Sequence, residues 1–391
     1  MRVLFTPFNW PTHYYGMATL AWAARAAGHE VRVAAQPSLT EAITQSGMSA
    51  VRAGGRQDFV SHAARFMHNQ QSSLSELPPE RMHELFHLRN ARFLATAQDA
   101  AEDLIAFTRS WRPDLIVSDP LVHAAPLVAG VLGVPIVHHL FGLDVARKMR
   151  LLGLPSPDGD EGFRAFYARY GVELAAEAAL RTIDPCPPSI RIPGGADVLP
   201  VRCVPYNGPG TVPDWMLKPA ERPRVCITWG TSTGVVGGAK SFRIPDLLGP
   251  VGKLDVEVVL TLRSSDAALV EDVPDNVRIV HDVPLSILLP TCAAIVYQGG
   301  GSTMLTSLYY GVPQVISPQV ADQHFNAQAI AGSGAGIHLD AAAVGDFDAV
   351  RDAVATAVSD EGIRAAADRL RDEVAAQPTP ADIIRTLEHL V

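Results

Sequence analysis

The chain has 391 residues, a length at which one hydrophobic core usually gives way to two domains. Hydrophobic residues make up 48% of the sequence and charged residues 19%, which excludes an intrinsically disordered chain. The net charge of −9 argues against general binding to a nucleic-acid backbone. The sequence has no run of eighteen apolar residues, so no membrane span is predicted.

The first half of the chain alternates predicted strands with predicted helices. Strands are predicted at residues 2–6, 30–35, 114–118 and 135–137, and helices at 17–27, 82–110 (as one or two helices) and 122–132. This alternation is typical of strand–helix–strand units, which build a parallel sheet.

A stretch rich in proline and glycine, residues 184–218, follows and suits an interdomain connection. The alternation then resumes. Strands are predicted at residues 224–228, 256–260, 277–280, 294–296 and after Gly311, with helices at 302–310, 324–332, 347–357 and 361–375. We therefore predict an α/β protein of two Rossmann-like domains, each with a doubly wound parallel sheet.

The strongest local motif is a predicted strand that runs into Gln298, three glycines and the pair Ser302-Thr303. Glycines let a ligand approach the backbone, and a helix start offers amide hydrogens and a positive dipole end. Both properties suit a diphosphate; the alternative is an ordinary strand-to-helix turn. The spacing fits neither G-x-G-x-x-G nor a P-loop, which argues against NAD and ATP.

A second polar motif, Asp322-Gln323, follows a predicted strand and precedes a predicted helix. In a doubly wound sheet, this carboxyl edge is where ligands bind. A carboxylate beside a carboxamide can hydrogen-bond neighbouring hydroxyls of a sugar. The alternative role for Asp322 is that of a helix N-cap.

His13 lies between the first predicted strand and the first helix, and Asp119 ends a later strand of the same expected sheet. A histidine there can act as a general base, and a neighbouring carboxylate would orient its ring. The alternative is a loop histidine without a catalytic role. Asp158 and Asp160 form a D-x-D sequence, which we interpret as a surface loop rather than a metal site.

Together these motifs resemble the inverting glycosyltransferases of the B-type fold (GT-B) that act in plant and bacterial secondary metabolism. The resemblance covers essentially the whole chain and is strongest to the actinomycete enzymes that attach deoxysugars to polyketide antibiotics, such as the spinosyn rhamnosyltransferase. It is carried by residues 1–13, 26–31, 111–119, 184–189, 204–208, 283–285, 299–303 and 322–323.

The resemblance implies an acceptor-binding domain at residues 1–205, a linker at 206–220 and a nucleotide-sugar-binding domain at 221–377, facing across a cleft. A C-terminal helix at about 378–391 would pack back onto the first domain. His13 would be the base and Asp119 its partner. The implied donor contacts are Gly230, Thr231, Val283, Gln298, Gly300, Gly301, Ser302, Thr303, Asp322 and Gln323. The residues expected to line the acceptor site are Phe66, Phe86, Phe141 and Asp144.

Two positions depart from the family pattern. Gln298 stands where the family often has histidine, so a neutral amide replaces a group that can carry positive charge. Asp282 stands where the family often has tryptophan or phenylalanine, which removes a stacking face for the nucleobase. Base recognition, and with it the choice between dTDP and UDP, is therefore open at this point.

The implied reaction moves a deoxysugar, with rhamnose as one candidate, from a dTDP-sugar to a hydroxyl of an apolar polyketide, with inversion and without a metal or other cofactor. Neither nucleic acid nor a membrane is an expected partner, and a homodimer is a candidate state. The start of the chain lacks the pattern of a signal peptide, so we expect a cytoplasmic protein. The alternatives are C-glycosylation of an aromatic polyketide, a non-catalytic sugar-nucleotide-binding helper, and a sugar-nucleotide epimerase.

Overall fold

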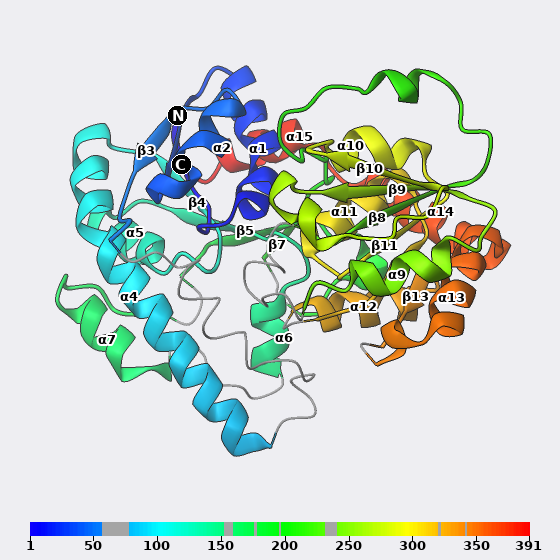
Figure 1. Cartoon of the computed structure of the whole chain (residues 1–391). Helices are drawn as coiled ribbons and strands as arrows, with labels where there is room; N and C mark the ends of the chain where they lie inside the picture. Colours follow the sequence, from blue (N-terminus) through cyan, green and yellow to red (C-terminus); the bar gives the residue numbers. More distant parts are fainter. Residues whose placement is uncertain are drawn as a thin grey trace.

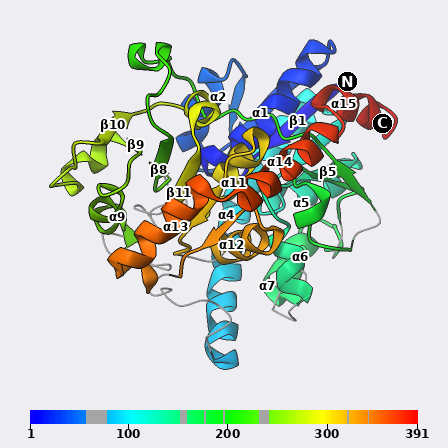
Figure 2. The same cartoon turned by 90° about the vertical axis from the view of Figure 1, so that its right-hand side faces the viewer.

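Figure 1 shows the computed structural model of the chain, in which two α/β domains lie side by side, and Figure 2 shows it after a quarter turn. The structure describes residues 1–56, 78–151, 159–175, 178–194, 197–230, 241–319, 322–340 and 342–391. Phe66 and Thr231 lie outside these residues, so the roles suggested for them stay predictions.

The first domain is built on a seven-stranded parallel sheet with the order β3-β2-β1-β4-β5-β6-β7. Its strands are β1 (Arg2–Thr6), β2 (Glu30–Ala35), β3 (Ala50–Arg52), β4 (Leu115–Ser118), β5 (Ile136–His139), β6 (Arg181–Asp184) and β7 (Val198–Pro200). Thr6 at the end of β1 pairs with Ser118 at the end of β4. The segments that follow these two strands are therefore neighbours, although they are far apart in the sequence.

Helices cover both faces of this sheet. The helices of this domain are α1 (Pro11–Ala26), α2 (Thr40–Gln45), α4 (Pro79–Trp111), α5 (Ala124–Leu132), α6 (Val145–Leu151) and α7 (Glu161–Ala168). It also has the short 3-10 turns η1 (Pro37–Leu39) and η4 (Pro188–Ile190), and η4 contacts α12 (Asp322–Ser333) of the second domain. Where the sequence predicts one or two helices near residues 82–110, the structure has the single helix α4. Pro11 and Pro79 each stand in a first helical turn, where a missing amide hydrogen costs nothing.

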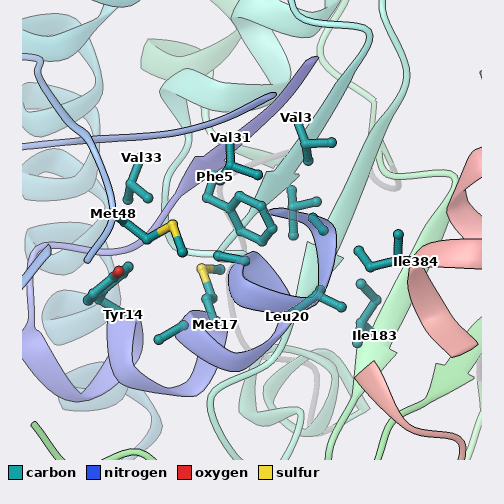
Figure 3. Close-up of a cluster of buried hydrophobic side chains, with 14 of the residues drawn as sticks. Val3, Phe5, Tyr14, Met17, Leu20, Val31, Val33, Met48, Ile183 and Ile384 are labelled. Carbon is teal, nitrogen blue, oxygen red and sulfur yellow. The ribbon is translucent and has the colours of Figure 1, made fainter. Parts of the chain in front are cut away.

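The core on one face of the first sheet includes the last helix of the chain, α15 (Pro380–Glu388). Ile383, Ile384 and Leu387 of this helix are buried together with strand residues such as Val3 and Phe5. Figure 3 shows Ile384 facing Ile183 and Leu20 in this cluster. Thr379 and Asp382 form a capping box, which fixes where α15 begins.

The second domain holds a six-stranded parallel sheet with the order β10-β9-β8-β11-β12-β13. Its strands are β8 (Arg224–Thr228), β9 (Glu257–Leu262), β10 (Val277–His281), β11 (Ala294–Tyr297), β12 (Gln314–Ile316) and β13 (Gly336–His338). Its helices are α9 (Ile244–Val251), α10 (Leu285–Leu288), α11 (Gly301–Tyr310), α12 (Asp322–Ser333), α13 (Phe347–Ser359) and α14 (Glu361–Ala376). The 3-10 turns are η5 (Asp214–Leu217), η7 (Ser264–Leu269), η8 (Leu289–Thr291) and η9 (Ala343–Gly345). Helices α9 and α13 cover one face, and α11, α12 and α14 cover the other.

The predicted class, two doubly wound α/β domains with parallel sheets, is confirmed. Four short strands, β3, β6, β7 and β13, were not predicted, and β7 lies inside the stretch rich in proline and glycine. No helix in the described part of the chain combines the length and apolarity that crossing a bilayer requires.

The connection from β7 to β8 is fixed against the second domain by Asn207. Its side-chain amide donates a hydrogen bond to Thr306 Oγ1 of α11 at 3.1 Å, and its side-chain oxygen accepts one from the Ser286 amide of α10 at 2.9 Å. Figure 1 shows this connection passing over α10 before it reaches β8. One linker residue is thus hydrogen-bonded to two helices, α10 and α11, and α11 begins at the glycine run.

Candidate active site

His13 and Asp119 lie together at the carboxyl edge of the first sheet. Asp119 directly follows β4, and His13 stands in the first turn of α1, which follows β1. His13 Nδ1 is 2.6 Å from Asp119 Oδ2, and the other carboxylate oxygen accepts a hydrogen bond from the Leu121 amide at 2.8 Å. The Asp119 side chain is fully buried, whereas that of His13 is 12% exposed. The carboxylate therefore favours a proton on Nδ1 and leaves Nε2 as the acceptor atom of the neutral ring.

Aromatic rings surround the imidazole of His13. The Phe141 ring, in the loop between β5 and α6, has its centroid 3.8 Å from that of His13 at an interplanar angle of 32°. Phe8 lies on another side, with its centroid at 5.2 Å. These contacts place the imidazole in apolar surroundings, which suit the binding of an apolar molecule.

Two other residues expected at the acceptor site are engaged elsewhere. Phe86 is buried, and the guanidinium of Arg89 lies 4.2 Å from its ring centroid. The carboxylate of Asp144 pairs with Arg147 at 3.1 Å and accepts a hydrogen bond from the Arg147 amide at 2.9 Å. Asp144 thus stabilises the start of α6, and its expected role at the acceptor stays a prediction.

The glycine run forms a sharp turn between β11 and α11. Gly299 has a φ of +96°, a backbone conformation that disfavours any side chain. Asn326, on α12, donates a hydrogen bond from its side chain to the Gly299 carbonyl at 2.8 Å. Gly300 is the N-cap of α11, and among the described residues no side chain caps this helix. The amides of its first turn, at Gly301, Ser302 and Thr303, therefore suit an anion.

Gln298 lies behind this turn and is almost fully buried, with 2% of its surface exposed. A methyl group placed on Gly230 would approach its side-chain nitrogen to 2.5 Å, and one on Gly300 would approach it to 3.0 Å. Its side-chain oxygen is buried and finds no hydrogen-bond partner within the described part of the chain. Gly230 and Gly300 therefore enclose a side-chain amide whose oxygen can still accept a hydrogen bond.

Asp322 and Gln323 open α12 at the carboxyl edge of the second sheet. Burial raises the pKa of Asp322 to about 6, and the nearby charge of His13 opposes this rise. The two side chains are thus close enough to interact although they belong to different domains. Gln323 is buried, and its side-chain oxygen accepts a hydrogen bond from the Gln319 amide at 2.9 Å.

Val283, proposed at the nucleobase, is half-buried and packs beside the core of the second domain. The preceding Asp282 is exposed with a φ of +55°, and Ser264 Oγ donates a hydrogen bond to its carboxylate at 3.5 Å. The linker passes closely here, since a methyl group on Gly210 would lie 2.2 Å from Pro284 Cδ.

The two domains touch where the Phe141–Gly142 segment meets the glycine run. A methyl group on Gly142 would lie 3.3 Å from Gly301 Cα, and one on Gly301 would lie 3.1 Å from the Phe141 carbonyl oxygen. Helices α1 and α11 are also in contact. The structure therefore brings His13 and Phe141 of one domain together with Gly301 and Asp322 of the other.

Sequence reasoning missed Asn326 and Gly142. Asn326 stands four residues after Asp322 on α12, so the helical repeat was a usable signal. The closeness of Gly142 to Gly301 is a tertiary contact that no local pattern reveals. Asp160 of the D-x-D sequence caps α7 by accepting hydrogen bonds from the amides of Gly162 and Phe163 at 2.8 and 3.3 Å. No group of histidine, cysteine, aspartate or glutamate residues suited to hold a metal occurs among the residues whose positions are described.

Comparison with known proteins agrees with this architecture. The family described as erythromycin biosynthesis protein CIII-like matches with its N-terminal domain at residues 22–230 and its C-terminal domain at residues 245–390. The chain is 39% identical to the 10-deoxymethynolide desosaminyltransferase of Streptomyces venezuelae, over 100% of this chain and 97% of the relative.

Two solved structures share the whole fold. The glycosyltransferase VinC, in complex with dTDP, has a TM-score of 0.84 and 33% identity, covering 100% of this chain and 99% of the other. The spinosyn rhamnosyltransferase SpnG has a TM-score of 0.83 and 30% identity, covering 99% and 100%, and has been solved with thymidine diphosphate and with spinosyn aglycone. The chain belongs to the erythromycin biosynthesis protein CIII-like family and is a nucleotide-sugar-dependent glycosyltransferase with the GT-B fold.

Proposed function

We propose that this enzyme transfers a deoxysugar from a dTDP-sugar to a hydroxyl group of an apolar polyketide-type natural product, with inversion. The observation that carries the proposal is the His13–Asp119 pair, which lies at the domain contact formed by Phe141 and Gly301. The relatives named for desosamine or rhamnose transfer support a deoxysugar donor, and the dTDP complexes of VinC and SpnG support dTDP as its carrier.

In the proposed reaction, His13 Nε2 takes the proton of the acceptor hydroxyl while the hydroxyl oxygen attacks the anomeric carbon. The bond between that carbon and the diphosphate oxygen breaks, and dTDP leaves with the electron pair. Asp119 keeps the proton on Nδ1 and stabilises the imidazolium that forms. General-base assistance of this kind contributes about 10²–10⁴-fold to the rate.

The donor would bind in the second domain, residues 221–377, and the acceptor in the first, residues 1–205. The amides at the start of α11 would hold the diphosphate, whose leaving charge they stabilise. Gln298 would contribute its enclosed amide, and Asp322 would accept hydrogen bonds from sugar hydroxyls. Val283 would contact the nucleobase, as the resemblance implies.

O-transfer is favoured over C-transfer. The base for C-transfer would be a carboxylate near residues 141–144, and Asp144 in that segment is paired with Arg147. His13, in contrast, presents a partly exposed ring already oriented by a carboxylate. A homodimer and a cytoplasmic location stay predictions from the sequence.

The proposal is tested by incubating the purified enzyme with a panel of dTDP-deoxysugars and polyketide aglycones and measuring products by mass. The expected product has the mass of aglycone plus sugar less one water, and dTDP is released only when acceptor is present. Donor conversion without acceptor would indicate an epimerase, and a sugar that resists acid hydrolysis would indicate C-transfer. Donor binding by calorimetry without turnover of any pair would indicate a helper, and no donor binding would refute the proposal.

A further inference from the structure

Phe141 contacts the catalytic base and the donor domain at the same time. Its ring lies against His13, with centroids 3.8 Å apart, while its carbonyl oxygen faces Gly301 at the start of α11. The next residue, Gly142, approaches Gly301 so closely that a methyl group on it would lie 3.3 Å from Gly301 Cα. One short loop between β5 and α6 therefore touches both halves of the proposed reaction centre.

The hydrogen bond to Asp119 alone does not fix the orientation of the His13 ring. The bond holds Nδ1 beside the carboxylate, but the ring can still tilt relative to the line from Nδ1 to Asp119 Oδ2. Such a tilt moves Nε2, on the far side of the ring. The Phe141 ring, inclined by 32° to the imidazole, limits that motion on one side, and Phe8, at 5.2 Å, limits it on another. A change of about 1 Å in the position of a reacting group costs about 100-fold in rate, so this restraint matters.

We infer that Phe141 is a positioning residue which holds the His13 ring in its reactive orientation and ties that orientation to the placement of the donor loop at Gly301. This inference rests on the proposed function. It assigns Phe141 a role in the chemical step instead of the acceptor-lining role suggested by the resemblance. The two loops meet backbone to backbone at Gly301 and Gly142, where a side chain would crowd the contact.

The two roles of Phe141 predict different kinetics. Phe141→Leu keeps apolar bulk and removes the flat ring. As a positioning residue, Phe141 acts only in the transition state, so kcat should fall by about tenfold with acceptor KM and dTDP affinity unchanged within about twofold. Phe141→Tyr keeps the ring and should restore most of kcat. A rise in acceptor KM at unchanged kcat would overturn the inference and support a wall of the acceptor site.

Gly301→Ala tests the link to the donor loop. Its methyl group must displace the Phe141 carbonyl by a few tenths of an ångström, because the two would otherwise be 3.1 Å apart. The matched control is Gly332→Ala on α12, where nothing lies within 4 Å. We expect Gly301→Ala to lower kcat by about threefold or more in the wild-type background and less in the Phe141→Leu background. Gly332→Ala should leave kcat unchanged.

Additive effects of Gly301→Ala and Phe141→Leu on kcat would overturn the coupling between loop and base. Thermal midpoints of every variant show whether each remains folded, and Phe141→Tyr keeps the positioning role testable if Phe141→Leu does not fold. If the wild-type enzyme transfers no sugar, the proposed function fails. If it transfers sugar and Phe141→Leu matches it in kcat, only this inference fails.

Discussion

His13 and Asp119 are separated by 106 residues in the sequence, yet Nδ1 of the first lies 2.6 Å from a carboxylate oxygen of the second. The pairing of β1 with β4 produces this contact, because their last residues, Thr6 and Ser118, lie opposite each other. His13 and Asp119 follow in the segments that leave these two strands. The relation of base and carboxylate is thus a property of the sheet order.

Asp119→Asn should lower kcat strongly while leaving the dTDP affinity intact. The amide is similar in shape, but it no longer stabilises the imidazolium and no longer selects the tautomer with the proton on Nδ1. We expect kcat to fall by about 10²-fold or more. The measurements are steady-state kinetics with saturating donor and calorimetric titration with dTDP. An unchanged kcat would show that Asp119 serves only the fold.

Gln298 should contribute to donor binding through its enclosed amide. Gln298→Leu removes the hydrogen-bonding group and should weaken dTDP-sugar binding by about tenfold, the worth of about 1–1.5 kcal/mol. Gln298→Glu keeps the shape of the side chain and adds negative charge near the diphosphate. At pH 8 it should therefore weaken dTDP-sugar binding more than Gln298→Leu does. Gln45→Leu on the exposed face of α2 is the control. Calorimetric affinities that match the wild type in both Gln298 variants would contradict this role.

Donor affinity should depend on pH because of Asp322. Burial raises its pKa to about 6, so the carboxylate is mostly protonated at pH 5 and ionised at pH 7. An ionised carboxylate is the better acceptor for sugar hydroxyls, and the dissociation constant of the dTDP-sugar should therefore fall as pH rises through about 6. Both phosphates of the donor are esterified and do not titrate in this range.

Asp322→Asn supplies the control for that pH dependence. The amide has no ionisation, so its donor dissociation constant should be flat between pH 5 and pH 7. The measurement is a set of calorimetric titrations at fixed ionic strength. An equal slope in the variant and the wild type would assign the pH dependence to another group.

The last helix should stabilise the first domain rather than the second. Leu387 of α15 is fully buried in the core under the first sheet, so Leu387→Ala should cost about 2–5 kcal/mol in the free energy of unfolding. His389→Ala, at an exposed position beyond that helix, should change stability by less than about 0.5 kcal/mol. Urea unfolding followed by tryptophan fluorescence checks both, and a neutral Leu387→Ala would show that α15 is dispensable for the fold.

The two-domain α/β fold followed from the sequence because the central strands β1, β4, β8 and β11 are mainly apolar runs of four or five residues with helical segments between them. The edge strands β3, β7 and β13 have only three residues each, which is too short for a period of two to stand out. β7 also lies among prolines and glycines, which are typical of loops.

The candidate site residues could also be proposed from the sequence, whereas their mutual arrangement could not. His13, Asp119, Asp322 and the glycine run each follow a strand at the carboxyl edge of a sheet, where the rule for doubly wound sheets places ligands. The contact of Phe141 with both His13 and Gly301 depends on how the two domains meet, and no local pattern encodes that. The resemblance assigned Asp144 to the acceptor site, and it did not indicate the ion pair that Asp144 forms with Arg147.

His13→Ala asks whether His13 is the base of a sugar transfer whose donor is held by the other domain. Turnover of a dTDP-deoxysugar with an accepted polyketide and calorimetric binding of dTDP are measured on the same preparation. We expect kcat to fall by about 10²–10⁴-fold with the dTDP affinity unchanged. Full turnover in the variant, or loss of turnover only in proportion to lost dTDP binding, would contradict it.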